Sequence, residues 1–303
     1  MAGHERLEFT QAQRRMLDRY GVVAQSRFVY TPSIGGRAHA LVVGDGPPVV
    51  MVNGIGTPAA MWAPLMAHLS GFRLHAIDLP GYGLTDTTPD LAEDLRTSAV
   101  RFLDEAVQAL GLERPAFVSN SMGSLWATWL ALERPDRVAA MIHIGCPAVV
   151  LETSAPFPMR LLSARPMGRL LTRLQPPSRS QVRQMSRMVG EYPLPAELID
   201  LLVATERLPG FRHTFLSTLH VLVRLRGNRP RHRLTASELE LVTQPTLLLW
   251  GDRDPFGSPA VGERVAAAMP CAELRVVNGG HCPWLKNAAS IGPAATRFLH
   301  EHA

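Results

Sequence analysis

Short apolar runs alternate with longer segments of helical periodicity along most of the chain. Each run has the length of a strand, and the later runs are continuously apolar, as is typical of a parallel sheet covered by helices on both faces. The predicted strands are residues 26–31, 37–43, 48–53, 73–78, 116–120, 138–145, 245–251 and 273–278. The predicted helices are residues 58–69, 90–110, 122–134, 258–268 and 284–301, together with a partly amphipathic N-terminal helix. This alternation predicts a ligand site at the carboxyl ends of the strands.

The alternation stops between the sixth and seventh predicted strands. From about Pro147 to Thr243 no segment has the pattern of a strand, and Pro, Arg, Met and Leu dominate. Arginines recur there every four residues, which places each trio along one side of a helix: Arg165, Arg169 and Arg173, then Arg179, Arg183 and Arg187. We therefore predict an α/β core formed by residues 1–147 and 244–303, with a helical insertion at 148–243 above the carboxyl edge of the sheet.

The composition is that of a folded globular protein. Of the 303 residues 46% are hydrophobic and 19% are charged, which excludes a disordered or fibrous chain. No apolar run approaches the roughly 18 residues of a membrane span, and the N-terminus lacks the apolar stretch of a signal peptide. The three widely spaced cysteines indicate neither a disulfide framework nor a metal site. We therefore expect a cytoplasmic protein with reduced thiols.

Basic residues concentrate in one stretch of the chain. The net charge is +5, yet residues 160–233 hold 14 arginines against four acidic residues. Such an excess indicates a local role and not nucleic-acid binding by the whole chain. The arginines form either a solvated face or a contact with an anionic partner, which could be a substrate carboxylate, a phosphopantetheine-linked acyl group or an acidic carrier protein. No pattern specifies an oligomeric state.

The boundary between the strand at 116–120 and the next helix carries a candidate nucleophile. The residues there are Ser119-Asn120-Ser121-Met122-Gly123, a serine with small residues two positions away on each side. A sharp strand-to-helix turn requires those small neighbours, and the helix that follows favours negative charge at its start. A turn alone would also explain a cluster of serine and glycine, so Ser121 needs a base to become a nucleophile.

Two later strands end in residues that supply such a base. The last strand leads into His281, and Gly279 and Gly280 allow the chain to bend before it. The strand before it ends at a glycine followed by Asp252 and Asp254. A carboxylate there can orient the imidazole and stabilise its protonated form. We choose Asp254, with Asp252 as the second candidate, so the order along the chain is nucleophile, acid, base.

That order and the segments that carry it resemble the α/β-hydrolase superfamily over nearly the whole chain. The matching segments are VVMVNGIGT, HAIDLPGYGLTD, VSNSMGSLW, LLLWGDRDPF and NGGHCPWL. The resemblance implies a mostly parallel eight-stranded sheet with flanking helices and a helical cap inserted after the sixth strand. It implies no metal and no cofactor. It also implies that the backbone N–H groups of Ile55 and Met122 form an oxyanion hole.

The sequence departs from this family near the oxyanion loop. Family members usually carry His-Gly there, whereas this chain has Asn53-Gly54. We expect Asn53 to hold the loop, although its amide could instead contact the substrate. Gly54, Asn120 and Trp284 are further candidates for lining a substrate pocket, and core packing is the alternative for Trp284.

The resemblance leaves three functions open. The first is a serine hydrolase that cleaves an ester, thioester or lactone with an apolar acyl group, through an acyl-enzyme. The second is a carbon–carbon bond hydrolase of the meta-cleavage type, whose members share an Asn-Ser-Met-Gly turn and a tryptophan near the catalytic histidine. The third is a ligand-binding protein that keeps the hydrolase fold but has little turnover.

Overall fold

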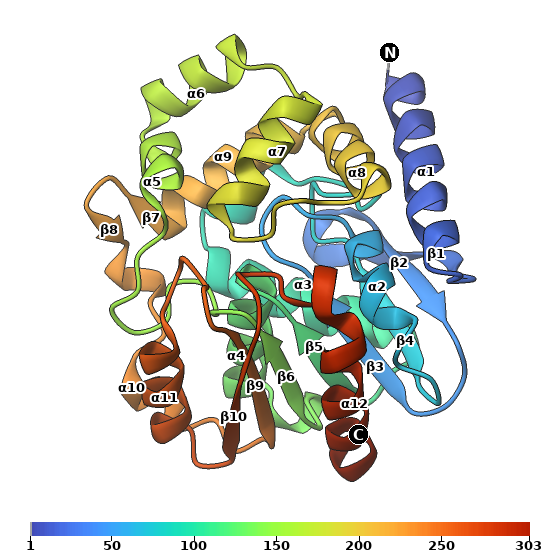
Figure 1. The fold of residues 1–303 in the computed structure, drawn as a ribbon, viewed down its shortest axis with the longest axis vertical. Helices are drawn as coiled ribbons and strands as arrows, with labels where there is room; N and C mark the ends of the chain where they lie inside the picture. The colour runs from blue at the N-terminus through green and yellow to red at the C-terminus, as the bar shows by residue number, and fades with distance from the viewer. Residues whose placement is uncertain (1) are drawn as a thin grey trace.

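Eight strands form one sheet in the computed structural model, which describes residues 2–303 (Figure 1). Their order across the sheet is β1-β2-β4-β3-β5-β6-β9-β10. Their bounds are Gln25–Thr31 (β1), Gly36–Val43 (β2), Pro48–Val52 (β3), Arg73–Ile77 (β4), Ala116–Ser119 (β5), Met141–Ile144 (β6), Thr246–Gly251 (β9) and Ala272–Val277 (β10). All the predicted strands are present, and the predicted α/β-hydrolase fold with its mostly parallel sheet is confirmed.

Only the N-terminal edge of the sheet is antiparallel. Strand β1 pairs antiparallel with β2, and β2 pairs antiparallel with β4, whereas every pairing from β4 to β10 is parallel. Every residue of β5, β6 and β9 is buried. The continuous apolar runs of these strands are therefore explained by helices on both faces.

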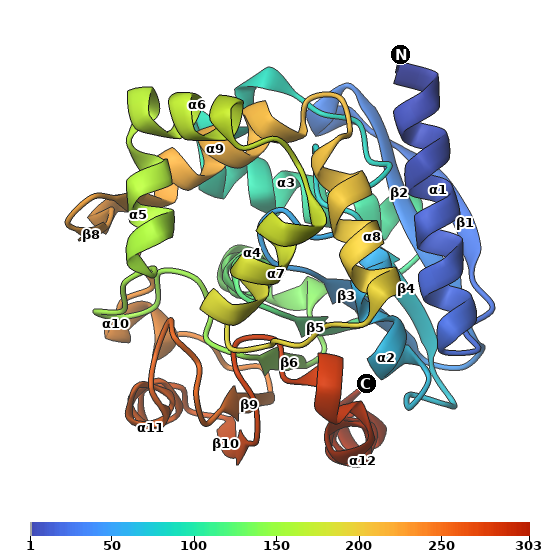
Figure 2. The same cartoon turned by 45° about the horizontal axis from the view of Figure 1, so that its top comes forward.

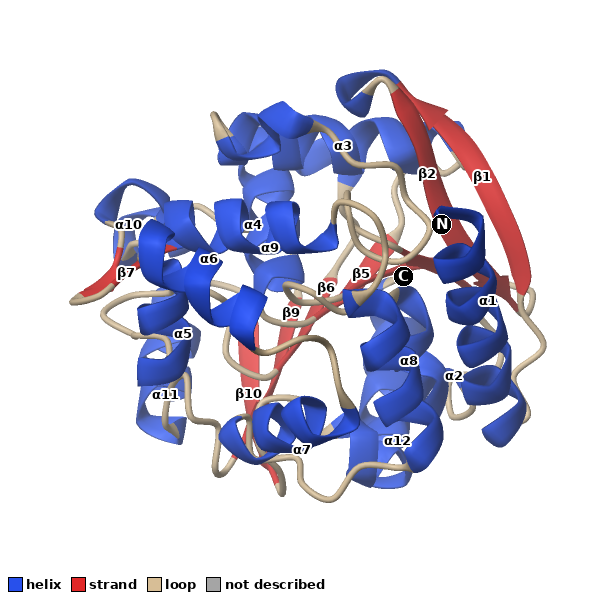
Figure 3. Cartoon of the chain, turned by 90° about the horizontal axis from the view of Figure 1, so that it is seen from above, coloured by secondary structure: helices blue, strands red, loops and turns tan. Residues whose placement is uncertain are grey.

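The helices outside the insertion are Ala2–Arg19 (α1), Ala63–Met66 (α2), Leu95–Ala109 (α3), Met122–Glu133 (α4), Pro259–Ala268 (α11) and Trp284–His302 (α12). All of them except α1 lie on the two faces of the sheet, as Figures 1 and 3 show. Two predicted helices are shorter than expected. The one at 58–69 divides into a 3-10 turn at Ala59–Trp62 and the short α2, and the one at 90–110 begins at Leu95 after a 3-10 turn.

Residues 148–243 are referred to below as the helical segment. Its helices are Phe157–Ser163 (α5), Arg165–Leu174 (α6), Arg179–Met188 (α7), Ala196–Glu206 (α8), Phe211–Leu222 (α9) and Ala236–Leu239 (α10). Helices α5 to α9 of this segment lie above the carboxyl ends of the strands, whereas α10 lies beside α11 (Figures 1 and 2). A small hairpin of Val223–Arg224 (β7) and Gly227–Asn228 (β8) was not predicted. Strands of two residues are too short to give a periodic signal. Gly227, the first residue of β8 after the turn, has φ 131°, a value that glycine adopts readily.

The first helix of the chain packs against the helical segment. Helix α1 lies alongside α8 (Figure 2), where Arg19 forms an ion pair of 3.1 Å with Glu197. Arg207, just after α8, lies 3.5 Å from Glu8 of α1. The N-terminal helix therefore links the core to the helical segment by packing, in addition to the two covalent connections near residues 147 and 243.

Candidate active site

Ser121 lies at a strained turn between β5 and α4. It is the residue before the first turn of α4. Its backbone adopts φ 53° and ψ −114°, a conformation that residues other than glycine rarely adopt. A Cβ atom at position 123 would collide with the backbone carbonyl oxygens of Val52 and Asn53. Glycine is therefore required at 123, as the sequence pattern predicted, because α4 starts directly against the end of β3.

Ser119, the other small residue of the turn, also makes a specific contact. Its hydroxyl lies 2.8 Å from Nδ1 of His143 on β6, and Nε2 of His143 lies 3.3 Å from the hydroxyl of Thr128 on α4. Burial lowers the pKa of His143 to about 3. The neutral ring can then accept a hydrogen bond from the Ser119 hydroxyl at Nδ1 and donate Nε2–H to Thr128, which links β5, β6 and α4 beneath Ser121.

His281 and Asp254 form a buried pair. Nδ1 of His281 lies 2.9 Å from Oδ2 and 3.1 Å from Oδ1 of Asp254. The carboxylate also accepts the backbone N–H of Cys146 at 2.8 Å and that of Phe256 at 2.9 Å. Since a carboxylate only accepts, Nδ1 carries the proton and Nε2 keeps its lone pair. Asp254 thus defines both the orientation and the tautomer of the imidazole.

Asp252, the second candidate, does not contact the imidazole. Its Oδ1 accepts the backbone N–H of Gly279 at 2.8 Å, and its Oδ2 lies 3.1 Å from Arg253. Asp252 therefore stabilises the turn that carries His281 and leaves the position beside the ring to Asp254.

The free nitrogen of His281 is buried without a hydrogen-bond partner among residues 2–303. No hydrogen bond joins it to Oγ of Ser121 in this structure, and catalytic hydrogen bonds often form only when substrate is bound. Asn120, next to Ser121, donates its side-chain amide to the carbonyl of His281 at 3.0 Å and to that of Ile144 at 2.7 Å. Phe256 stacks on the imidazole at 4.0 Å between ring centroids. These contacts place the histidine loop beside the nucleophile turn.

The oxyanion loop also lies against Ser121. A Cβ atom built on Gly54 would be 3.1 Å from Cβ of Ser121 and 3.0 Å from Oδ1 of Asn120. The backbone N–H groups of Ile55 and Met122 donate to no acceptor within the described part of the chain. Both groups therefore remain available to an oxygen atom bound next to Ser121.

Asn53 and Trp284 are both occupied by contacts with the protein. Asn53 is buried, and its amide donates to the carbonyl of Pro58 at 2.5 Å, which connects the two ends of the loop. Trp284 is fully buried, stacks on Trp62 at 4.3 Å and donates its indole N–H to the carbonyl of Met61 at 3.1 Å. Core packing therefore accounts for Trp284, and Asn120 likewise uses its amide on backbone carbonyls.

Glu191 is a site residue that the sequence patterns did not indicate. It lies just after α7 in the helical segment and is fully buried, and its Oε1 accepts the backbone N–H groups of Gly280 at 2.9 Å and Cys282 at 3.0 Å. These two residues flank His281, whose own N–H donates to the carbonyl of Val189 at 2.9 Å. Burial raises the pKa of the Glu191 carboxyl. It is the first acidic residue after Glu152, and this isolation in a basic stretch was the available signal.

We expect Glu191→Ala to lower kcat at least tenfold with a smaller change in KM, because two buried N–H groups beside His281 would lose their acceptor. Glu191→Gln keeps an acceptor oxygen and is expected to restore most of the rate. Steady-state kinetics with a pH profile of kcat/KM tests this. If Glu191→Gln were as slow as Glu191→Ala, the charge of the carboxyl and not its acceptor oxygen would be the important property.

The cysteine beside His281 does not compete with Ser121 as a nucleophile. Burial raises the pKa values of the Cys282 and Cys146 thiols well above their ordinary range. Both therefore remain protonated thiols near neutral pH, and a thiol is a much weaker nucleophile than a thiolate.

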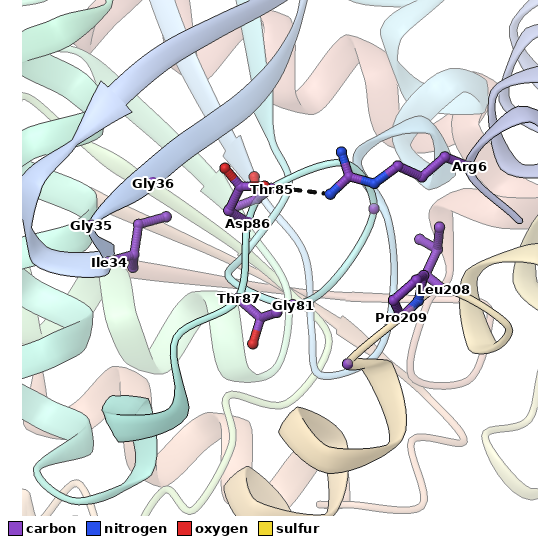
Figure 4. A pocket seen from close by; sticks show the side chains of 12 residues that line it. Arg6, Ile34, Gly35, Gly36, Gly81, Thr85, Asp86, Thr87, Leu208 and Pro209 are labelled. Carbon is purple, nitrogen blue, oxygen red and sulfur yellow. Dashed lines mark hydrogen bonds and ion pairs between the residues drawn. The ribbon is translucent and has the colours of Figure 1, made fainter. Parts of the chain in front are cut away.

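Two surface pockets lie away from Ser121. One, of about 400 Å³, lies between the turns after β4 and η1 (Pro32–Ile34) and the start of α9, and Figure 4 shows Arg6 reaching across it to Asp86. The polar groups there are already paired, since Asp86 also accepts the N–H of Arg37 at 2.9 Å and Thr85 donates to the carbonyl of Asp78 at 2.6 Å. The other pocket lies between α1 and helices α7 and α8. Neither contains a nucleophile with a base, so Ser121 remains the candidate site.

A metal centre is not evident: within residues 2–303, no three His, Cys, Asp or Glu side chains cluster in a way that could hold an ion. In the same part of the chain, none of the helices has the length and apolar character needed to cross a membrane.

Comparison with known proteins agrees with this geometry. The family model of the alpha/beta hydrolase fold matches residues 47–288, so the chain belongs to the alpha/beta hydrolase family. Members of this family are hydrolases, and the nucleophile turn, the histidine loop and the oxyanion loop described above occur within the matched residues. The protein is therefore an enzyme of the alpha/beta hydrolase type.

Individual relatives fall into two groups. The chain is 27% identical over 262 residues to a 2-hydroxy-6-oxononadienedioate/2-hydroxy-6-oxononatrienedioate hydrolase of Cupriavidus pinatubonensis, covering 83% of this chain and 86% of that one. It is 25% identical over 292 residues to a pimeloyl-[acyl-carrier protein] methyl ester esterase of Shewanella sp., covering 89% and 97%. Its fold is similar to that of the carboxylesterase CesB of Bacillus subtilis, with a TM-score of 0.77, 20% identity and 98% of each chain covered.

Proposed function

We propose that the protein is a serine hydrolase that cleaves a carboxylic ester, thioester or lactone with an apolar acyl group. The observation that carries this proposal is the pairing of a strained turn at Ser121 with an imidazole whose Nδ1 lies 2.9 Å from Oδ2 of Asp254. This arrangement provides a nucleophile, a base with a free Nε2 lone pair and a group that orients the base.

The proposed reaction has two halves. Ser121 Oγ bonds to the substrate carbonyl carbon while its proton passes to Nε2 of His281, and the oxyanion accepts the N–H groups of Ile55 and Met122. The imidazolium then gives that proton to the departing oxygen or sulfur, which leaves an acyl-enzyme. Water, deprotonated by His281, attacks the acyl carbon, and return of the proton to Ser121 releases the acid. Each oxyanion donor is expected to contribute roughly 10²–10³ in rate.

A carbon–carbon bond hydrolase of the meta-cleavage type is the second candidate. The similarity to 2-hydroxy-6-oxononadienedioate/2-hydroxy-6-oxononatrienedioate hydrolases favours it, as does the shared Asn120-Ser121-Met122-Gly123 turn. Two observations favour the ester reading instead. Trp284 is fully buried and stacks on Trp62. The arginines of α6 and α7, which could bind the carboxylate of a dienoate only from inside the helical segment, lie on exposed surfaces.

A substrate panel separates the two functions. We expect turnover of nitrophenyl esters and of acyl thioesters, with rates that rise with the length of the acyl chain, and no cleavage of a vinylogous 1,5-diketone dienoate. Cleavage of the dienoate without turnover of any ester would reject the ester assignment in favour of the carbon–carbon bond reaction. If the protein bound acyl ligands but turned over neither substrate class, the ligand-binding alternative would be favoured.

A further inference from the structure

Helix α6 exposes two adjacent strips of side chains that differ in chemistry. Arg165, Arg169 and Arg173 form one strip, and all three are exposed. The other strip is apolar: the exposed fractions are 39% for Met167, 52% for Leu170 and 72% for Leu174. At 3.6 residues per turn the two strips are centred roughly 130° apart around the helix, one on each side of its outward direction. The inner side is marked by Gly168, which packs against the carbonyl of Leu162 and the side chain of Leu216. We refer to these six exposed residues as the α6 face.

The α6 face lies on the outer surface of the molecule and is surrounded by more residues of the same kind. Figure 1 shows α6 at the outer end of the helical segment, far from the sheet, and Figure 2 shows α5 leading into it. Phe157 of α5 is 59% exposed, and Arg160 lies over its ring. Residues 153–190 contain seven arginines and no aspartate or glutamate. Arg183 and Arg187 of α7 are exposed as well.

Three ordinary explanations do not account for this surface. A solvated face would not need three exposed apolar side chains on a helix of ten residues. An interaction with a second copy of the chain about a two-fold axis would place six arginines in one interface, because both copies contribute the same patch. An acidic protein partner would match the arginines but would leave the apolar strip without a function.

An anionic lipid surface matches both strips. Amphipathic helices that bind membrane interfaces have a basic polar side and an apolar side with Leu, Phe or Met, and they lie in the plane of the interface. Arginines close to anionic headgroups gain electrostatic attraction, and the neighbouring apolar side chains leave water for the acyl boundary. We propose that the α6 face binds the surface of a membrane that contains anionic lipids.

Binding through the α6 face would determine which side of the enzyme faces the membrane. Helices α5 to α9 lie over the carboxyl ends of the strands, so binding through α6 directs that side of the molecule towards the lipid. The binding proposal does not depend on the proposed reaction, because association with vesicles is measured without turnover.

Co-sedimentation with phosphatidylcholine vesicles, with and without phosphatidylglycerol, tests the proposal. We expect the whole chain to bind only the vesicles that contain phosphatidylglycerol, and more weakly as salt increases. Arg165→Gln/Arg169→Gln/Arg173→Gln is expected to weaken binding on the order of a hundredfold. Leu170→Gln/Leu174→Gln, which leaves the charge unchanged, is expected to weaken it at least about tenfold.

Matched variants elsewhere on the surface serve as controls. Arg101→Gln/Arg114→Gln/Arg297→Gln removes the same charge from exposed positions outside the helical segment, and Leu241→Gln removes a leucine that is 69% exposed. Both controls are expected to bind vesicles as the unchanged protein does. Equal loss in the charge control would mean that net charge and not the α6 face is responsible, and would overturn the proposal.

Three further results would also overturn it. One is no binding to phosphatidylglycerol vesicles. Another is self-association in size-exclusion chromatography that Leu170→Gln/Leu174→Gln abolishes, which would assign the face to a second copy. The third is binding to polyglutamate as tight as to vesicles and unaffected by the leucine changes, which would assign it to an acidic protein.

Discussion

Replacing Ser121 by alanine is expected to abolish ester hydrolysis, with a loss of at least about 10⁴ in kcat. The change removes the only atom that would form the acyl-enzyme, and loss of the serine of a comparable triad removes nearly all of the rate that the triad supplies. It also removes the target of fluorophosphonate probes. The measurements are steady-state hydrolysis of a nitrophenyl ester and probe labelling of the unchanged and variant proteins.

Ser124→Ala is the matched control for this change. Ser124 lies three residues further along, in the first turn of α4, and is buried, and its hydroxyl has no hydrogen-bond partner within residues 2–303. Its removal leaves no unpaired group behind, so activity and labelling are expected to remain normal. Full activity of Ser121→Ala, or labelling that persists in it, would show that Ser121 is not the nucleophile.

Asp254→Asn is expected to lower kcat about 10⁴-fold while the fold is retained, as found for the equivalent change in a serine protease triad. The asparagine can turn its NH₂ group towards the ring, so that Nδ1 accepts and Nε2 carries the proton. In that tautomer Nε2 cannot take the proton of Ser121. Kinetics at several pH values, together with a thermal unfolding curve, measures the effect.

Asp252→Asn separates this role from a general effect of charge. Asp252 lies two residues away, and an asparagine there retains an oxygen that can accept the N–H of Gly279. We expect less than a tenfold loss in kcat. A larger loss in Asp252→Asn than in Asp254→Asn would reject the assignment of Asp254 as the residue that orients His281.

Local sequence signals were sufficient to predict the turn at Ser121 and the strands of the sheet. The turn at Ser121 could be predicted because a steep strand-to-helix turn needs small residues at 119 and 123, and the structure shows the collision that a side chain at 123 would cause. The strands could be predicted because continuous apolar runs of that length fit a parallel sheet covered on both faces. Helix starts were less accurate, since the chain before Leu95 forms a 3-10 turn instead of extending α3.

Contacts between distant segments could not be predicted in the same way. Whether Trp284 lines a pocket or the core depends on Trp62, more than two hundred positions earlier, and no local pattern encodes that stacking. Glu191 is similar, because its acceptor role appears only when the helical segment folds back onto the loop around His281. The choice between Asp252 and Asp254 required the distances to the ring.

The packing of α1 on α8 changes how the helical segment is attached to the rest of the molecule. Two covalent connections, near Pro147 and Thr243, would allow the segment to rotate about the line between them like a lid on a hinge. The ion pairs of Arg19 with Glu197 and of Arg207 with Glu8 add a third point of support away from that line. Three supports oppose that rotation, so we expect substitutions in α1 that break these pairs to loosen the attachment of the helical segment to the core.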